Sequence, residues 1–244
     1  VGISNLTIGN ISICMYYGNS STVTSGENIT GVWDSNYVAV LHLDEASGTF
    51  FDSTVYASNG TNIGMTYRTA GKVDGAVNKT AATNAINLTN NSNLRPANAV
   101  TEEAWVRSRD ATTQWEAIGG TTSSTAWTDG YGIVFNSAST VQFFVSSYTG
   151  NVATGSISPV GNWNYVAGTY DKNAGSNQVK VYVNGTAGTA DTNTAPITYK
   201  GTLFHIVDMA GWTTNWFNGT VDEFRISNVA RSADWINQSY QIVA

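Results

Sequence analysis

Short runs of alternating apolar and polar residues repeat along most of the chain and predict a fold built from β-strands. From residue 36 onward these runs are separated by clusters of glycine, asparagine, serine and threonine, the spacing expected of an antiparallel sandwich. The clearest run, residues 179–183, places three valines on one face and ends at Asn184-Gly185, which suits a type I′ turn. The predicted strands cover residues 37–43, 84–89, 101–107, 130–136, 140–147, 162–170, 177–184, 202–208 and 219–227.

Helix-forming sequence is nearly absent from the chain. The one candidate begins at Ser232, whose hydroxyl can cap the helix, and Asp234 complements the dipole of the first turn. The segment is short and lies near the end of the chain. We therefore expect Trp235 and Tyr240 to anchor it to the sandwich.

The first 30 residues have a different pattern. Alternating apolar positions in residues 3–17 predict a strand, and the polar stretch that follows predicts a linker. We divide the chain into an N-terminal strand and linker, residues 1–30, and one sandwich domain, residues 31–244. Because a lone strand exposes unpaired backbone groups, we expect it either to fold onto its own sandwich or to add to the sheet edge of a neighbouring chain.

The composition excludes several classes of partner. Only 11% of the residues are charged and the formal charge is −6, without any basic run, so nothing attracts nucleic acid or anionic lipid. No apolar stretch is long enough to enter a membrane as a spanning helix, and the start at Val1 is expected of a mature form or fragment. The single cysteine, Cys14, cannot form an internal disulfide, and we expect a buried thiol. The amide- and hydroxyl-rich polarity favours a secreted or cell-surface location.

The chain is rich in acceptor triplets for N-linked glycans, Asn-X-Ser/Thr. In Asn-Gly turns the alternative is a tight turn that uses positive φ, and elsewhere some triplets arise by chance in so asparagine-rich a sequence. The candidate acceptors are Asn5, Asn10, Asn19, Asn28, Asn59, Asn78, Asn87, Asn90, Asn184, Asn218 and Asn237.

Four segments together resemble one known family. They are residues 38–45 (VAVLHLDE), 163–170 (WNYVAGTY), 179–185 (VKVYVNG) and 218–227 (NGTVDEFRIS). They resemble the LamG-like, concanavalin A-type jelly-roll module, over about residues 37–240. The resemblance implies an all-β, two-sheet antiparallel jelly-roll sandwich with a short C-terminal helical turn. The segment before it is similar to the end of an uncharacterised β-domain that often precedes such modules.

The same resemblance implies a structural Ca²⁺ near the first and last strands. Ca²⁺ takes six to eight oxygen ligands, and the chain offers oxygen donors at the matching places: Asp44, Asp52, Asn59 and Asp222. Around Asp52 and Asn59 the sequence is similar to the family's Asp-Ser-Ser and Asn-Gly pattern, although Tyr56-Ala57 departs from its glycine-rich loop. The alternative is that these residues form ordinary Asx turns.

The chain lacks the residue patterns expected of an enzyme. Glycoside hydrolases on this fold space their carboxylates along one strand face, whereas Glu102 and Glu103 are adjacent and so are predicted to face opposite sides, as are Asp222 and Glu223. The two histidines, His42 and His205, lie in apolar strands without a nucleophile or metal motif and are expected to be satisfied core residues. We therefore predict no catalytic residues and no enzyme activity.

Two loops combine aromatic rings with amide and hydroxyl groups, which is what sugar recognition requires. The first holds Trp127, Asp129 and Tyr131, and the second holds Trp212 and Trp216, while Tyr148 is a weaker candidate. The alternative is that these large amphipathic rings seal the ends of the sandwich or form a protein interface.

The sequence favours a non-catalytic extracellular module for adhesion or recognition, with carbohydrate or a cell-surface glycan as the partner. A second interpretation is structural. In it the protein is a subunit of an extracellular filament, appendage or surface layer, assembled by strand addition through residues 1–17 and shielded by N-linked glycans.

Overall fold

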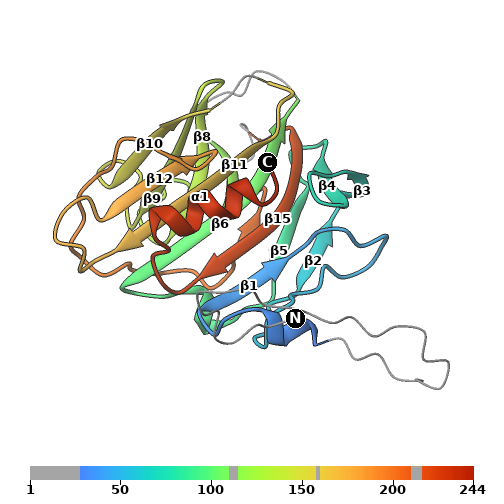
Figure 1. Ribbon diagram of the computed structural model, residues 1–244, viewed down its shortest axis with the longest axis horizontal. Helices are drawn as coiled ribbons and strands as arrows, with labels where there is room; N and C mark the ends of the chain where they lie inside the picture. The colour runs from blue at the N-terminus through green and yellow to red at the C-terminus, as the bar shows by residue number, and fades with distance from the viewer. Residues whose placement is uncertain (1–27, 110–114, 158–159, 210–215) are drawn as a thin grey trace, which may run out of the picture.

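A computed structural model describes residues 28–109, 115–157, 160–209 and 216–244. Two antiparallel sheets pack face to face (Figure 1), which confirms the predicted all-β sandwich. The eight-stranded sheet runs in the order β13 (Thr186–Ala187), β12 (Val179–Val183), β11 (Asn164–Asp171), β6 (Ala99–Ser108), β15 (Gly219–Ser227), β4 (Gly75–Lys79) and β3 (Thr66–Ala70), with β1 (Tyr37–Leu41) also paired to β15.

The second sheet has seven strands. Its order is β10 (Val152–Ser156), β9 (Thr140–Val145), β8 (Tyr131–Ser137), β7 (Glu116–Thr121), β14 (His205–Ile206), β5 (Ala85–Leu88) and β2 (Gly60–Ile63). Two 3₁₀ turns, Ile29–Val32 and Ser92–Leu94, and one helix, α1 (Ala233–Gln241), complete the described elements.

The core lies between the two sheets and follows the period of two in the sequence. Val100, Ala104 and Val106 of β6 are fully buried there against the facing strands. The predicted hairpin is confirmed: Val183 pairs with Thr186, and both turn residues have positive φ, 50° at Asn184 and 77° at Gly185.

A β-bulge in β15 corrects one expectation about side-chain direction. The strand register shifts between Asp222 and Arg225, and Glu223 has a φ of 51°. Val221 and Phe224, on either side of the shift, both point into the core. Asp222, Glu223 and Arg225 therefore all lie on the outer face of the sheet, so the prediction that Asp222 and Glu223 face opposite sides is wrong.

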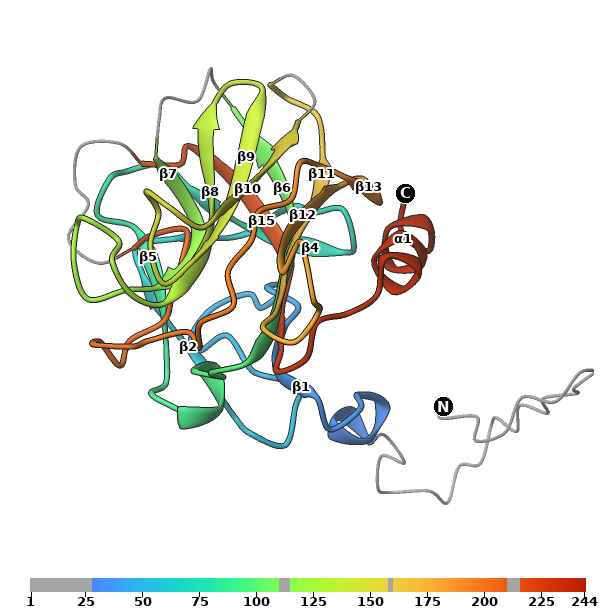
Figure 2. The same cartoon turned by 90° about the vertical axis from the view of Figure 1, so that its left-hand side faces the viewer.

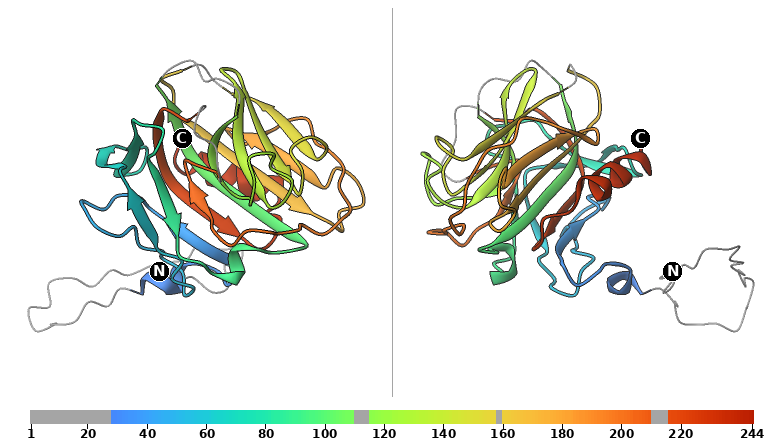
Figure 3. Two further views of the ribbon diagram at one scale, coloured as in Figure 1. Left: turned by 180° about the vertical axis from the view of Figure 1, so that it is seen from behind. Right: turned by 60° about the vertical axis from the view of Figure 1, so that its left-hand side comes forward.

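Helix α1 lies across the outer face of the eight-stranded sheet, away from the other sheet (Figures 2 and 3). Ser232 caps it as predicted, because its side chain accepts the backbone N–H of Trp235. Ile236 is fully buried against Trp105 and Tyr165, and Tyr240 packs on the same ring of Trp105.

Several predictions fall outside the described residues. The N-terminal strand, its pairing and Cys14 all lie in residues 1–27, so the domain boundary at residue 30 stays a prediction. No helix in the described part of the chain has the length and apolarity needed to cross a membrane.

Candidate functional site

An aromatic pocket lies on the outer face of the seven-stranded sheet. It has a volume of about 220 Å³ and is lined by Trp115, Thr125, Ala126, Trp127, Tyr148 and Thr149. Three rings thus come from two loops and the start of β7, and the surrounding hydroxyls are neutral. The pocket occupies the region where the sequence predicted a sugar site, but the roles of the residues differ.

Trp127 forms the inner wall of the pocket instead of an exposed stacking surface. Its side chain is only 2% exposed, and it stacks on Phe144 with ring centroids 5.7 Å apart. Tyr148 meets it edge-on at 5.1 Å. A ligand can therefore contact only the part of Trp127 that borders the pocket, while Trp115 and Tyr148, both half-buried, provide the accessible rings.

Tyr148 joins the pocket to a row of polar side chains on the same sheet face. Its hydroxyl lies 2.5 Å from Gln142 Oε1 and 3.1 Å from Asn136 Oδ1, so it can donate to either oxygen. Gln142 in turn donates from Nε2 to Thr154 Oγ1 at 3.1 Å. Burial, opposed by a hydrogen bond with the Trp115 side chain, raises the pKa of Tyr148, so the phenol is neutral and keeps its proton for donation.

Trp115 was not among the site residues predicted from the sequence. This residue has a φ of 70°, and its backbone N–H donates to the carbonyl oxygen of Phe135 at 2.8 Å. That backbone conformation starts β7 and turns the indole toward the pocket. The available signal was a tryptophan placed directly after a polar stretch and before an apolar strand, a position where a ring tends to be surface-accessible.

Asp129 and Tyr131 are structural, which corrects their assignment as ligand-binding residues. Asp129 is 1% exposed, and its carboxylate accepts the backbone N–H groups of Ser123 and Lys200. Burial opposes its ionisation, but these hydrogen bonds outweigh burial, and the pKa lies below its usual value. Tyr131 is fully buried and donates to the Leu94 carbonyl oxygen.

Most of the second predicted loop, residues 210–215, lies outside the described residues. Trp216 is half-buried, and Trp212 lies outside the described residues. Trp216 is not among the residues that line the aromatic pocket.

Two of the four calcium candidates, Asp52 and Asn59, accept hydrogen bonds from the backbone. Asp52 accepts the backbone N–H groups of Val40 and Thr54 on one oxygen and that of Ser58 on the other. Asn59 Oδ1 accepts the N–H of Asp52. These hydrogen bonds are the ones that Asx-type turns make, which favours the turn alternative at Asp52 and Asn59.

The remaining two candidates, Asp44 and Asp222, differ in burial. Asp44 is half-buried, whereas Asp222 is 0% exposed. Asp222 Oδ2 accepts the N–H groups of Lys72 and Val73, and its Oδ1 has no hydrogen-bond partner among the described residues, so the Ca²⁺ stays a prediction. Within the described ranges, no group of three or more histidine, cysteine, aspartate or glutamate side chains is arranged to hold a metal ion.

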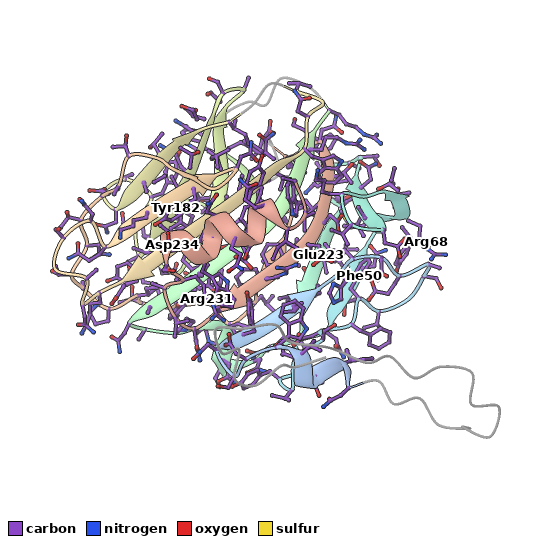
Figure 4. The ribbon with its side chains drawn as sticks, in the orientation of Figure 1. Phe50, Arg68, Tyr182, Glu223, Arg231 and Asp234 are labelled. Carbon is purple, nitrogen blue, oxygen red and sulfur yellow. The ribbon has the colours of Figure 1, made fainter. Side chains whose placement is uncertain are left out.

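The outer face of the eight-stranded sheet carries a charged network beside α1, with Glu223 on the same side of the sheet as the helix (Figure 4). Arg225 lies 2.5 Å from Glu223 and 3.7 Å from Glu103, and His42 lies 2.7 Å from Glu223. Tyr165 donates to Glu103 at 2.6 Å. Burial alone would raise the pKa of Glu223, but His42 and Arg225 outweigh burial and hold the pKa below its usual value, so the carboxylate is ionised. A network of paired charges ties β1, β6 and β15 together.

A family comparison identifies the chain. The family model of the concanavalin A-like lectin/glucanases superfamily, of laminin G type, matches residues 79–237. The chain belongs to this superfamily. The match confirms the resemblance seen in the sequence motifs. No curated protein sequence matches the chain.

Solved structures with the superfamily's sandwich are similar to the chain at low sequence identity. Domain 4 of the extracellular arabinanase AbnA from Geobacillus stearothermophilus, in complex with arabinotriose, is 20% identical with a TM-score of 0.61, over 83% of this chain and 97% of that one. Botulinum neurotoxin type C, in a study of its interaction with two ganglioside molecules, is 13% identical with a TM-score of 0.65, over 88% of this chain and 53% of that one.

A third similar structure is the sialidase of Trypanosoma rangeli in complex with sialic acid. It is 12% identical with a TM-score of 0.64, over 87% of this chain and 34% of the sialidase chain. The chain therefore corresponds to about half of the toxin chain and a third of the sialidase chain. At these identities the likeness establishes the shared sandwich fold of the superfamily.

The sandwich of this superfamily member sorts the predicted glycan acceptors by exposure. Asn28, Asn90 and Asn237 are exposed, whereas Asn78 is 2% exposed, so a glycan on Asn78 does not fit the folded chain. Asn184 donates from Nδ2 to Asn164 Oδ1 at 3.2 Å, which supports the turn alternative there. Half-buried acceptors are Asn59, Asn87 and Asn218, and Asn5, Asn10 and Asn19 lie outside the described residues.

Proposed function

We propose that the protein is a non-catalytic carbohydrate-binding module that recognises glycans through the aromatic pocket. The observation that carries this proposal is the combination of two accessible rings, Trp115 and Tyr148, with the amides of Asn136 and Gln142 on one sheet face. Aromatic rings cover the apolar face of a sugar, and amide and hydroxyl groups pair with its hydroxyls.

Similar structures support this function. One is described with arabinotriose, one in terms of gangliosides and one with sialic acid, so three proteins with this sandwich are associated with carbohydrate. Because one fold hosts many functions, the pocket carries the proposal, and the similar structures give it additional support.

The charged network on the other sheet supports a binding role over catalysis. Glycosidases need one protonated and one ionised carboxyl group beside the substrate. Burial raises the pKa of Asp222 to about 7, and Glu223 next to it is ionised, but Asp222 is 0% exposed and its Oδ2 is occupied by the backbone N–H groups of Lys72 and Val73. This pair therefore stabilises the sheet and does not reach a substrate.

The proposed setting is extracellular, on a cell surface or in a secreted protein, in keeping with the amide- and hydroxyl-rich composition. The alternative function, a subunit of an extracellular filament or surface layer, depends on residues 1–17. Because these lie outside the described residues, the pocket makes glycan recognition the better-supported proposal.

A glycan array followed by calorimetry tests the proposal. We expect binding to neutral glycans, and we expect Trp115→Ala to weaken it at least tenfold, or about 1.4 kcal/mol, because an accessible ring is lost. Trp163→Ala is the matched control, since Trp163 is also half-buried but lies on the other sheet, over Arg107. Absence of glycan binding, or equal binding by wild type and Trp115→Ala, would remove the pocket from the proposal.

A further inference from the structure

We infer that the aromatic pocket is one end of a longer binding track, and that the ligand is a neutral oligosaccharide chain and not a single sugar. This inference rests on the proposed function and specifies its ligand. The second end of the track is a polar groove of about 440 Å³, lined by Thr154, Gly155, Ser156, Val183, Thr186, Ala187, Gly188 and Thr189.

A ladder of side chains joins the two ends across the strands. Tyr148 borders the aromatic pocket and bonds to Gln142 on β9. Gln142 bonds to Thr154 on β10, and Thr154 lines the polar groove. The same three side chains thus run from one cavity into the other, across strands that lie next to one another (Figure 2).

The polar groove opens where the edges of the two sheets diverge. Thr154 exchanges both backbone hydrogen bonds with Thr189, at 2.8 and 2.9 Å, which closes the sandwich at this point. Two residues further along β10, Ser156 presents its N–H and C=O on the same edge, because backbone direction alternates along a strand. Ala187 does the same from β13, since its neighbour Gly188 donates to Val181 on the opposite side.

This arrangement suits the hydroxyl groups of a sugar. Each sugar hydroxyl both donates and accepts, and the groove offers backbone N–H and C=O groups as well as the exposed hydroxyls of Ser156, Thr186 and Thr189. None of the residues that line the pocket or the groove is charged, so nothing there pairs with the carboxylate of an acidic sugar. The chemistry favours a neutral glycan.

The dimensions favour a chain of sugars. The aromatic pocket alone is smaller than ordinary ligand sites, which occupy roughly 300–1,000 Å³, whereas the polar groove beside it, at about 440 Å³, falls within that range. Neighbouring strands are about 4.8 Å apart, so the path from Asn136 on β8 over Gln142 and Thr154 to Thr189 covers about 14 Å. That is longer than one sugar ring.

Ladders of neutral arabino-, cello- and xylo-oligosaccharides, from one to six sugar residues, test the inference by calorimetry on the full chain. We expect affinity in one ladder to rise at least tenfold from the disaccharide to the hexasaccharide. The double variant Ser156→Ala with Thr189→Val should lose that gain and bind the disaccharide as wild type does. The control Ser47→Ala with Thr83→Val removes two hydroxyls that are also exposed but do not line the groove, and it should change nothing.

The outcomes separate this inference from the proposed function. Equal affinity for disaccharide and hexasaccharide, or a length gain that survives in the double variant, would overturn the track while leaving the aromatic pocket as a sugar site. No binding in any ladder would overturn both. A synthetic peptide of residues 1–17 that binds wild type but not the double variant would overturn the track in favour of strand addition at this groove.

Discussion

Asp52 illustrates how a single carboxylate can be occupied by the backbone. Its two oxygens accept three backbone N–H groups and the hydroxyl of Thr54, and the side chain is only 9% exposed. Each of these donors would be left without a partner in a buried position if the carboxylate were removed. The residue therefore fixes the path of the chain beside β1.

Asp52→Ala should lower the free energy of unfolding by about 3 kcal/mol, because several buried donors lose their acceptor at once. Urea unfolding in calcium and in EDTA measures the loss, and we expect the same value in both. Asp44→Ala, at another residue proposed for calcium, should likewise show no dependence on calcium. A stabilisation by calcium that disappears in either variant would contradict our interpretation and restore the predicted ion.

At the candidate site, the sequence predicted the region better than the roles. The loop with Trp127 and the weaker candidate Tyr148 do meet in one pocket. The burial of Trp127 could not be predicted, because the rings that enclose it, Phe144 and Tyr148, come from β9 and the loop after β9, distant from Trp127 in sequence. Trp115 was missed because the local signal, a tryptophan between a polar stretch and an apolar strand, does not specify how the chain enters β7 or where the ring points.

At the scale of elements, β6 and β15 show where the period of two predicts structure and where it does not. In β6 the adjacent acids face opposite sides as predicted. Glu102 points into the core, where its Oε1 lies so close to Gly119 of the facing sheet that a Cβ added there would be 2.6 Å away. Glu103 accepts a hydrogen bond from Tyr165 on the outer face. In β15 the bulge at Glu223 breaks the alternation. A one-residue bulge leaves no apolar or turn signal, so the sequence pattern could not reveal it.

The inward acid of β6 gives the sandwich a dependence on pH. Burial raises the pKa of Glu102 well above its usual value, opposed in part by the backbone N–H of Ile133. The folded state is favoured fully below about pH 4.3, the pKa of this carboxyl group in the unfolded chain. As pH rises from there toward the raised pKa of the folded state, the free energy of unfolding falls, because the unfolded chain releases the proton first.

Glu102→Gln removes this titration and keeps the shape of the side chain. The unfolding free energy of the variant relative to wild type should therefore increase with pH above about 4.3, by up to about 1.4 kcal/mol per pH unit. Denaturant unfolding between pH 4.5 and 8 measures the difference. Asp74→Asn, at an exposed carboxylate, is the control and should run parallel to wild type; a pH-independent difference for Glu102→Gln would contradict the assignment.

At the scale of the whole molecule, the described core joins the start of the sandwich domain to its C-terminal helix. Its buried members begin at Tyr37 and extend to Ile236 in α1, and Arg231 pairs with Asp34 at 2.8 Å to join the two ends of the domain. The sequence pattern marked most of the longer strands by their apolar faces, but it did not predict the order of the strands in the two sheets. Short strands with polar or small residues, such as β2 and β3, were not predicted, because their pairing is decided by neighbouring strands.

A chain of residues 28–244 should therefore fold with the stability of the full chain and bind the same glycans. We expect the melting temperature to differ by less than 2–4 °C, the shift that about 1 kcal/mol produces in a domain of this size. Calorimetric melting and light scattering of both chains, prepared alike, make the comparison. A larger fall would mean that residues 1–27 complete their own sandwich. Unchanged stability, together with an assembly formed only by the full chain, would mean that these residues serve a neighbouring chain, as the structural interpretation requires.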